Sequence, residues 1–353
     1  MQCCNSKTII MNENNNNNIF CNRKNILVTG GAGFIGSELT RQLVKYGFHV
    51  IVIDSLINGK KENLKGLIED GVNLTVADIR DEAEIDKLTK QAEVVFHLAC
   101  LGVRHSIHDP LENHDVNATA TLNLLNAARR NGVKRFIYIS SSEVYGTAKW
   151  VPMTEEHPTL PNTVYGASKL AGECYTRAFF ETYDYPTTVI RPFNAYGPNC
   201  HHEGDSGEVI PKFLLRTLSG LPMIVFGDGK QTRDFTYVTD TARGIIECGL
   251  HEKTIGQTIN IGSSCEISID ELATHVSKMN EGQSRVIHEP PRPGDVLRLY
   301  ADTTKALQLC GYKPRITLRE GLQKLKNWYL GAGISPQELL KSEIVKNWEI
   351  FQK

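Results

Sequence analysis

A tyrosine and a lysine stand four positions apart, at Tyr165 and Lys169. On a helix this spacing places both side chains on one face. An ammonium group beside a phenol favours the phenolate, so Tyr165 is predicted to take a proton from a hydroxyl group while hydride leaves the same carbon. Ser141 follows an apolar stretch and is predicted to face the same crevice, at the carboxyl end of a parallel strand. A surface pair has the same spacing, so the neighbouring motifs decide between the two interpretations.

A second motif is the glycine-rich turn at residues 29–36, Thr-Gly-Gly-Ala-Gly-Phe-Ile-Gly, which follows an apolar run. Its glycines fit a dinucleotide fingerprint: one makes a tight turn, one admits a pyrophosphate and one packs a helix on a strand. The helix that follows would present its N-terminus to the phosphates. Asp54 ends the next predicted strand, where an acid binds the ribose hydroxyls and repels a 2′-phosphate, which favours NAD over NADP. The predicted cofactor-binding residues of the turn are Gly30, Gly33, Phe34, Ile35 and Gly36.

Short apolar strands that alternate with helical stretches must position these residues. The predicted strands are Asn25–Thr29, His49–Ile53, Val94–Leu98, Arg135–Ser140 and Thr187–Arg191. Such alternation predicts an α/β fold, a Rossmann-type doubly wound parallel sheet with helices on both faces. A smaller, mixed α/β C-terminal substrate lobe is expected to follow, with helices at about Val209–Ser219 and Ile269–Asn280.

Four segments are predicted along the chain. Residues 1–22 are an Asn-rich leader with nothing to bury and are predicted to be disordered. Residues 23–192 form the Rossmann domain, and residues 193–334 form the substrate lobe, interleaved with the first. Residues 335–353 are predicted to be one amphipathic helix.

The composition excludes several classes of protein. The 353 residues carry 39 Lys and Arg against 40 Asp and Glu, and a net charge of −1 gives no electrostatic basis for sequence-independent nucleic-acid binding. Apolar runs are far shorter than a membrane helix needs, and the first ten residues lack the apolar core of a signal peptide. The nine scattered cysteines contain no CxxC pair, which predicts neither a zinc site nor a disulfide framework, but reduced thiols in the cytoplasm.

From about Lys24 to Leu330 the sequence resembles an extended short-chain dehydrogenase/reductase of the nucleotide-sugar epimerase/dehydratase type. The resemblance rests on many motifs in order. They are TGGAGFIGS (29–37), DIRD (78–81), HLAC (97–100), SSSEVYG (140–146), YGASK (165–169), RPFNAYGP (191–198), FGDGKQTRDFTYV (226–238) and RPGDVLRLYAD (292–302).

The resemblance implies that tightly held NAD oxidises C4 of a nucleotide sugar, in a homodimer. Tyr165 is then the base, Lys169 holds the nicotinamide ribose, and Ser141 orients the 4-hydroxyl group. Further implied cofactor contacts are Asp78 and Ile79 at the adenine and Leu98 and Ala99 along the cofactor, with Asn117 packed beside the site. Implied substrate contacts are Asn194, Arg233 and Arg292 at the diphosphate.

Two of these positions have structural alternatives. Arginines form forked contacts with phosphate oxygens, but Arg233 also has acidic neighbours in sequence, Asp234 and Asp240, with which it would form a salt bridge. Phe226 either contacts the nucleobase or packs in the core.

The reaction that follows C4 oxidation depends on Glu143. The resemblance implies that a Glu here removes the C5 proton in 4,6-dehydratases, whereas 4-epimerases usually have a small or polar residue. Its structural alternative is a cap or salt bridge at the strand end. Many dehydratases have Asp where Ser142 stands, and serine is a poorer acid; other dehydratases and the glucuronate decarboxylases have serine. We therefore expect a UDP-sugar 4,6-dehydratase, with a 4-epimerase or a UDP-glucuronate decarboxylase as alternatives.

Arg104 lies in a loop that resembles glucuronate 4-epimerases, in which the arginine meets a substrate carboxylate. Its structural alternative is a bridge to Asp109 or Glu112. The run His201-His202-Glu203 with Asp205 mimics a metal cluster, but its spacing lacks a structural-zinc pattern. No metal is therefore predicted.

Overall fold

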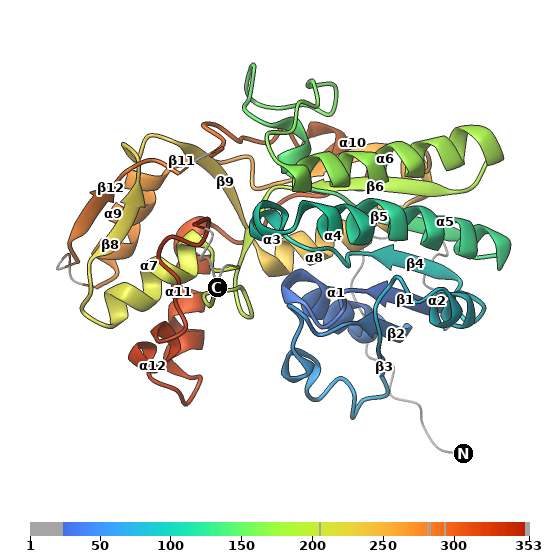
Figure 1. Cartoon of the computed structure of the whole chain (residues 1–353), viewed down its shortest axis with the longest axis horizontal. Helices are drawn as coiled ribbons and strands as arrows, with labels where there is room; N and C mark the ends of the chain where they lie inside the picture. Colours follow the sequence, from blue (N-terminus) through green and yellow to red (C-terminus); the bar gives the residue numbers. More distant parts are fainter. Residues whose placement is uncertain (1–23, 205, 281, 283, 293, 350–353) are drawn as a thin grey trace, which may run out of the picture.

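The main sheet of the computed structural model contains seven parallel strands in the order β10-β6-β5-β4-β1-β2-β3 (Figure 1). The structure describes residues 24–204, 206–280, 282, 284–292 and 294–349, so the predicted leader at 1–22 lies outside the described residues. The strands are β1 (Asn25–Thr29), β2 (His49–Asp54), β3 (Asn73–Val76), β4 (Val94–His97), β5 (Arg135–Ile139), β6 (Thr187–Pro192) and β10 (Thr258–Ile261).

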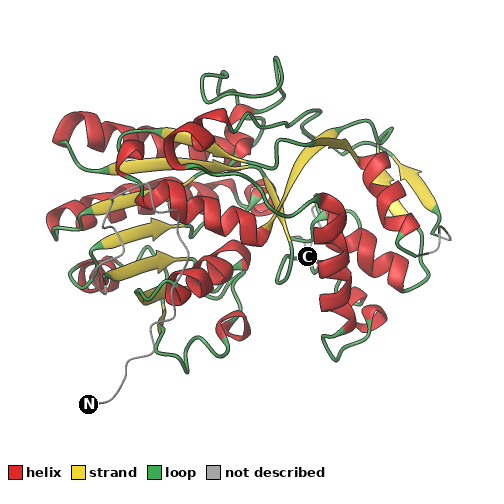
Figure 2. Ribbon diagram, turned by 180° about the vertical axis from the view of Figure 1, so that it is seen from behind, coloured by secondary structure: helices red, strands yellow, loops and turns green. Residues whose placement is uncertain are grey.

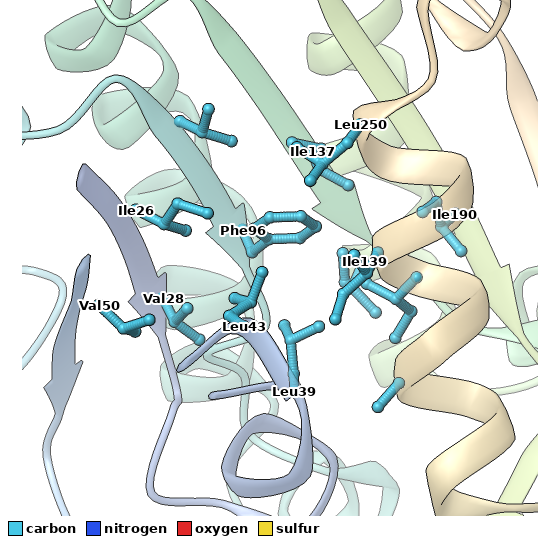
Figure 3. Close-up of a cluster of buried hydrophobic side chains, with 14 of the residues drawn as sticks. Ile26, Val28, Leu39, Leu43, Val50, Phe96, Ile137, Ile139, Ile190 and Leu250 are labelled. Carbon is cyan, nitrogen blue, oxygen red and sulfur yellow. The ribbon is translucent and has the colours of Figure 1, made fainter. Parts of the chain in front are cut away.

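Helices cover both faces of this sheet, as Figure 2 shows. The helices α1 (Phe34–Lys45), α8 (Val238–Leu250) and α10 (Thr304–Cys310) cover one face, and α2 (Glu82–Thr89), α5 (Ala120–Arg130) and α6 (Val164–Tyr183) cover the other. Successive strand residues therefore enter different cores: Ile26 and Val28 join the cluster of Figure 3, and Leu27 joins the cluster on the opposite face. This is the doubly wound α/β fold that the sequence predicts.

The smaller lobe is built on two short sheets. One contains β11 (Glu266–Ser268), β9 (Thr232–Tyr237) and β7 (Asn194–Tyr196), and the other contains β12 (Val286–Glu289) and β8 (Met223–Phe226). Three helices pack with these strands in a separate core: α7 (Val209–Leu218), α9 (Ile269–Lys278) and α11 (Leu318–Leu330). Between β9 and β11 the chain returns to the main sheet as α8 and β10, so the two lobes are interleaved.

The end of the chain differs from the predicted single helix at 335–353. Helix α12 (Pro336–Leu340) ends after five residues, and the described residues that follow form turns. The backbone N–H of Gly204 donates to the Ser342 carbonyl at 2.8 Å, and the Lys212 ammonium donates to the Ile344 carbonyl at 2.8 Å. These contacts with the smaller lobe use carbonyl groups that a continuous helix would bond internally. The remaining short elements are η1 (Lys61–Leu64), α3 (Val103–His108), α4 (Pro110–His114), η2 (Asp115–Thr119), η3 (Ser142–Tyr145) and η4 (Glu252–Thr254).

Two cysteines depart from the prediction of reduced thiols. Cys248 on α8 and Cys310 on α10 form a disulfide, with their Cα atoms 5.7 Å apart. They are 62 positions apart in sequence, and only the packing of α10 beside α8 brings them together. Sequence spacing alone therefore gave no signal for the pair.

A buried ion pair ties helix α6 to strand β6 below the site. The Glu173 carboxylate accepts from the Arg191 guanidinium at 2.8 and 2.6 Å, and Arg191 also donates to the Tyr145 hydroxyl at 2.8 Å. Burial alone would raise the pKa of Glu173, but the hydrogen bonds and charge of Arg191 outweigh it and hold that pKa below its ordinary value. The pair therefore connects α6 to the segment that carries Ser141 and Glu143.

Replacing Glu173 by Gln is expected to lower the free energy of unfolding by about 3–5 kcal/mol, because it leaves the Arg191 charge buried without its partner. Urea denaturation at neutral pH measures this. The exposed Glu181 lies on the same helix, and Glu181→Gln should change the stability by less than about 0.5 kcal/mol. A carboxylate with a depressed pKa stabilises the fold above its unfolded-state pKa, so the difference between wild type and Glu173→Gln should shrink as the pH falls through the carboxylate range. Equal stability at neutral pH would contradict the role of the pair.

Candidate active site

One pocket, with a volume of about 570 Å³, contains the residues that the sequence selects for chemistry. It is lined by the ends of β1, β4 and β5, by α6 and by residues of the smaller lobe. The structure thus brings together predicted site residues that lie between position 30 and position 292 of the sequence. The predicted site residues that line it are Gly30, Gly33, Phe34, Ile35, Gly36, Asp54, Asp78, Ile79, Leu98, Ala99, Arg104, Ser141, Ser142, Glu143, Tyr165, Lys169, Asn194, Arg233 and Arg292.

The glycine-rich turn has the close packing that a dinucleotide site needs. Gly30 has φ +71°, and a Cβ atom there would lie 2.7 Å from the Ala99 backbone nitrogen. A Cβ on Gly36 would collide with the Gly30 carbonyl oxygen. No side chain caps helix α1 at Gly33, and the residues of its first turn line the pocket, so the N–H groups of that turn remain for a phosphate.

Asp54 lies buried at the carboxyl end of β2 and holds this turn. Its carboxylate oxygens accept from the backbone N–H groups of Ala32 and Leu56, each at 2.9 Å. Burial raises the pKa of Asp54, and these backbone hydrogen bonds partly offset the effect. Because a carboxylate has about four acceptor positions, lone pairs remain for ribose hydroxyl groups. The arrangement fits the adenosine end of NAD.

The other predicted cofactor contacts lie along the same edge of the sheet. Asp78 pairs with Arg80 at 2.7 Å, and the hydrogen bond from Arg80 holds the pKa of Asp78 below its ordinary value. Ala99 follows β4, and its N–H donates to the Thr29 hydroxyl at 3.1 Å. Asn117 does not line the pocket: its amide accepts from the Leu101 N–H at 2.8 Å and donates to the Leu101 carbonyl at 2.9 Å. Asn117 therefore fixes the loop after β4 rather than contacting a ligand in the pocket.

Tyr165 and Lys169 lie on one face of α6, but the predicted lowering of the phenol pKa does not appear in the protein alone. Burial raises the pKa of Tyr165 well above its ordinary value, and a hydrogen bond with Ser141 offsets only part of this. The Lys169 ammonium instead donates to the Ile139 carbonyl at 2.6 Å and lies 4.5 Å from the Tyr138 ring. Burial also lowers the pKa of Lys169. The phenol is therefore protonated at neutral pH unless a ligand brings further positive charge.

Cys100 lies in the pocket beside Tyr165, although it was not among the site residues predicted from the sequence. Its thiol lines the pocket, interacts with Tyr165 and adds to the rise in the phenol pKa. The sequence contained an indication of this position, because Cys100 ends the HLAC motif directly after the predicted strand at Val94–Leu98.

Glu143 lies in the pocket on η3. The cap of this short helix is Ser141, whose hydroxyl accepts from the Glu143 N–H at 3.2 Å, so the Glu143 carboxylate is not used as a strand-end cap. Burial raises the pKa of Glu143, while the positive charge of Arg233 lowers it in part. Arg104 and Arg292 act in the same direction as Arg233. The neighbouring Ser142 is buried at the pocket wall.

Arg233 has a partner that the sequence did not indicate. Its guanidinium bonds to the Asp295 carboxylate at 2.7 Å. The two acids weighed from sequence are engaged elsewhere: Asp234 accepts from the Ser263 N–H at 2.7 Å, and Asp240 pairs with Arg243 at 2.8 Å.

Arg292 lies beside two aromatic rings that also contact each other. Its guanidinium carbon is 5.4 Å from the Phe226 ring centroid and 5.1 Å from that of Trp348. Burial and the nearby charge of Arg104 lower the pKa of Arg292 to about 10, which leaves it protonated at neutral pH. Phe226 therefore lines the pocket and also packs against the Trp348 ring.

Two further cations of the pocket were missed. Lys212 and Arg216 both line it from α7, four positions apart on the helix predicted at Val209–Ser219. Burial lowers the pKa of Lys212 to about 8. Helical periodicity would have placed both side chains on one face, but nothing in the sequence indicated that this face is turned to the pocket.

The histidine-rich loop forms no metal site in the described part of the chain. Glu203 pairs with Lys60 and accepts from the His202 N–H at 2.9 Å. Among the described residues, which do not include Asp205, no group of three or more His, Cys, Asp or Glu side chains is placed to hold a metal ion.

A family model, described as GDP-mannose 4,6 dehydratase, matches residues 27–325. The chain is 36% identical over 308 residues to UDP-glucose 4-epimerase of Mycolicibacterium smegmatis, a match that covers 86% of this chain and 97% of the relative. It is 35% identical over 326 residues to UDP-N-acetyl-alpha-D-glucosaminuronate decarboxylase of Bacillus cytotoxicus, covering 87% and 98%. The chain thus belongs to the extended short-chain dehydrogenases/reductases, in the family of NAD-dependent nucleotide-sugar epimerases, decarboxylases and dehydratases.

Solved structures agree with this assignment. An epimerase of Methanothermobacter thermautotrophicus superposes with a TM-score of 0.85 at 33% identity, over 92% of this chain and 97% of the other. The dTDP-glucose 4,6-dehydratase DesIV of Streptomyces venezuelae, solved with NAD, gives a TM-score of 0.82 at 31% identity, over 87% and 97%. The predicted NAD cofactor and nucleotide-sugar chemistry agree with these relatives. In the described part of the chain, no helix is both long and apolar enough to span a bilayer.

Proposed function

We propose that the protein is an NAD-dependent 4,6-dehydratase that acts on a UDP-linked sugar. The observation that carries the proposal is the carboxyl group of Glu143, which lies in the same pocket as Ser141, Tyr165 and Lys169. A 4-epimerase moves only the C4 hydride, so it has no need of a carboxylate there. A dehydratase must also remove a proton from C5.

In the first step the phenolate form of Tyr165 takes the proton of the sugar 4-hydroxyl group, which Ser141 orients. The cofactor is NAD, which when bound accepts the C4 hydride and later returns it. Because burial holds the Tyr165 phenol in its protonated form, its activation requires positive charge near the hydroxyl group. Lys169 lies on the same helix face and would supply part of that charge once its ammonium turns from the Ile139 carbonyl toward the phenol.

In the second step Glu143 takes the C5 proton, which the 4-ketone has made acidic. The C6 hydroxyl leaves as water and a C5–C6 double bond forms. C6 then takes the hydride that the reduced cofactor would supply, and solvent supplies the proton that returns to C5. Since Ser142 is a poor acid and is buried, the newly protonated Glu143 is the acid that gives its proton to the leaving hydroxyl. The raised pKa of Glu143 suits it both to take the C5 proton and to give a proton to the leaving hydroxyl group.

Two alternatives have their own support. A 4-epimerase is favoured by the UDP-glucose 4-epimerase of Mycolicibacterium smegmatis among the relatives. A decarboxylase is favoured by the charges of Arg104, Arg233 and Arg292 near Glu143, because a substrate carboxylate needs cations.

Product analysis separates the three reactions. The protein is incubated with UDP-glucose, UDP-N-acetylglucosamine and UDP-glucuronate, and with dTDP- and GDP-sugars, and products are identified by mass and NMR. A 4,6-dehydratase removes one water from a 6-hydroxy sugar. An unchanged mass with inverted C4 would replace the proposal by the epimerase, and loss of CO2 from UDP-glucuronate would replace it by the decarboxylase.

The homodimer and the cytoplasmic location remain predictions. The helices expected at the dimer interface are α5 and α6, and they carry exposed apolar side chains such as Leu122 and Tyr183. Light scattering of the purified protein, compared with its Leu122→Glu variant, tests the dimer: the wild type should have twice the mass of the variant.

A further inference from the structure

The chain continues past the family match, which ends at residue 325, and its last part lies against the pocket. We call residues 335–349 the C-terminal tail. Its helix α12 packs on α7. Lys212 on α7 donates to the Ile344 carbonyl at 2.8 Å, and Arg216 on the same helix bonds to the Glu343 carboxylate at 2.6 Å.

These contacts make the C-terminal tail one wall of the pocket. Glu343 and Val345 line it together with the cations of α7. The Asn347 side chain is buried and donates to the Gly207 carbonyl at 3.3 Å. Arg216 and Glu343 are both about nine-tenths buried, with 11% and 8% of their side chains exposed. The tail is thus anchored at several points on the smaller lobe.

Trp348 brings the tail into contact with Arg292. Its ring meets the Phe226 ring edge to face, with centroids 4.6 Å apart, and lies 5.1 Å from the Arg292 guanidinium. Because the two rings touch, no nucleobase fits between them. A guanidinium held against aromatic faces keeps its in-plane N–H groups for an anion. Among the described residues the buried Nε of Arg292 has no hydrogen-bond partner, so at least this donor is available.

We propose that the C-terminal tail completes a diphosphate-binding subsite, in which Trp348 is a positioning residue that holds Arg292 toward a nucleoside diphosphate. The proposal rests on the proposed function in taking a nucleotide sugar as the ligand. In this subsite the pyrophosphate of the ligand would bind the Arg292 guanidinium, which packs on the two aromatic rings. Lys212 and Arg216 of α7 line the same pocket.

Calorimetric titration with UDP tests this on the full chain. Trp348→Ala should weaken UDP binding by about tenfold, the size of a partly desolvated cation–π contact. Trp348→Phe, which keeps a ring, should restore most of the affinity. In turnover assays Trp348→Ala should raise KM and leave kcat near wild type, since ground-state and transition-state binding are weakened together. The matched control is Trp328→Ala on α11, a partly exposed tryptophan whose ring packs on Tyr329 rather than on Arg292, and this variant should bind UDP as the wild type does.

The bound NAD content and the melting temperature of each variant are measured beside the titrations, so that loss of fold is recognised. Unchanged UDP affinity in a folded Trp348→Ala protein would overturn the proposal. Tighter UDP binding would also overturn it, because it would show that the tail obstructs the pocket. If the wild type binds UDP and converts a UDP-sugar while Trp348→Ala matches it, only the role of the tail fails. If the wild type binds no UDP, dTDP or GDP, the proposed function fails as well.

Discussion

Replacing Tyr165 by Phe is expected to lower the rate of C4 oxidation by about 10²–10⁴-fold, the usual contribution of a positioned acid or base. The substitution removes only the hydroxyl oxygen, so the ring still packs on α6 and the pocket keeps its shape. The proton of the sugar hydroxyl then has no acceptor. Single-turnover measurement of NADH formation after mixing with a nucleotide sugar reports this step directly.

The matched control is Tyr183→Phe, at the exposed end of the same helix, which should oxidise the sugar at the wild-type rate. A Tyr165→Phe protein that forms NADH as fast as the wild type would remove Tyr165 from the mechanism. Because Ser141 forms a hydrogen bond with the phenol, Ser141→Ala is expected to slow the same step by a smaller factor.

Replacing Glu143 by Gln is expected to stop the elimination while sparing the oxidation. Gln has the size of Glu but cannot take the C5 proton, so water loss should fall by about 10²–10⁴-fold. The 4-keto sugar and NADH should accumulate, since Tyr165 still acts. Mass analysis of the sugar and absorbance of NADH follow the two steps separately.

Glu208 supplies the control for Glu143, because it is another partly buried carboxyl at the same pocket, and burial raises its pKa to about 7. Glu208→Gln should keep water loss near the wild-type rate. If Glu208→Gln abolishes water loss and Glu143→Gln does not, the C5 base has been assigned to the wrong carboxylate.

The raised pKa of Glu143 sets the direction of the pH dependence. The base acts only when it is deprotonated, so the elimination rate should fall as the pH drops through this pKa. Because burial moves that pKa above the ordinary carboxyl value of 4.5, the acid limb of the pH–rate profile should lie above that pH. An acid limb at or below the ordinary value would indicate that Glu143 is exposed to solvent in the working enzyme.

Most of the predicted site residues line one pocket, because each motif follows a strand. Ser141, Ala99 and Gly30 stand at the carboxyl ends of three neighbouring parallel strands, and such ends meet at one edge of a sheet. The strand at Asn25–Thr29 agrees residue for residue with β1, because its apolar run is bounded by a lysine and by glycine. Local pattern was therefore enough for the first lobe.

Features that depend on distant packing were not predictable. The seventh strand, β10, lies in the range assigned to the second lobe, and only its pairing with β6 shows that it completes the first. Asp295 was not recognised as the partner of Arg233, because the contact spans 62 positions. The phenol pKa of Tyr165 depends on burial, which residue spacing alone does not report.

Deuterium tracing tests whether C4 oxidation is followed by removal of the C5 proton and loss of water. The protein is incubated in D2O with UDP-glucose and with UDP-N-acetylglucosamine, and the products are examined by mass spectrometry and NMR. We expect a 4-keto-6-deoxy sugar that has lost one water and carries solvent deuterium at C5, with the C4 hydride moved to C6. A product of unchanged formula, inverted at C4 and without solvent deuterium on carbon, would contradict this expectation.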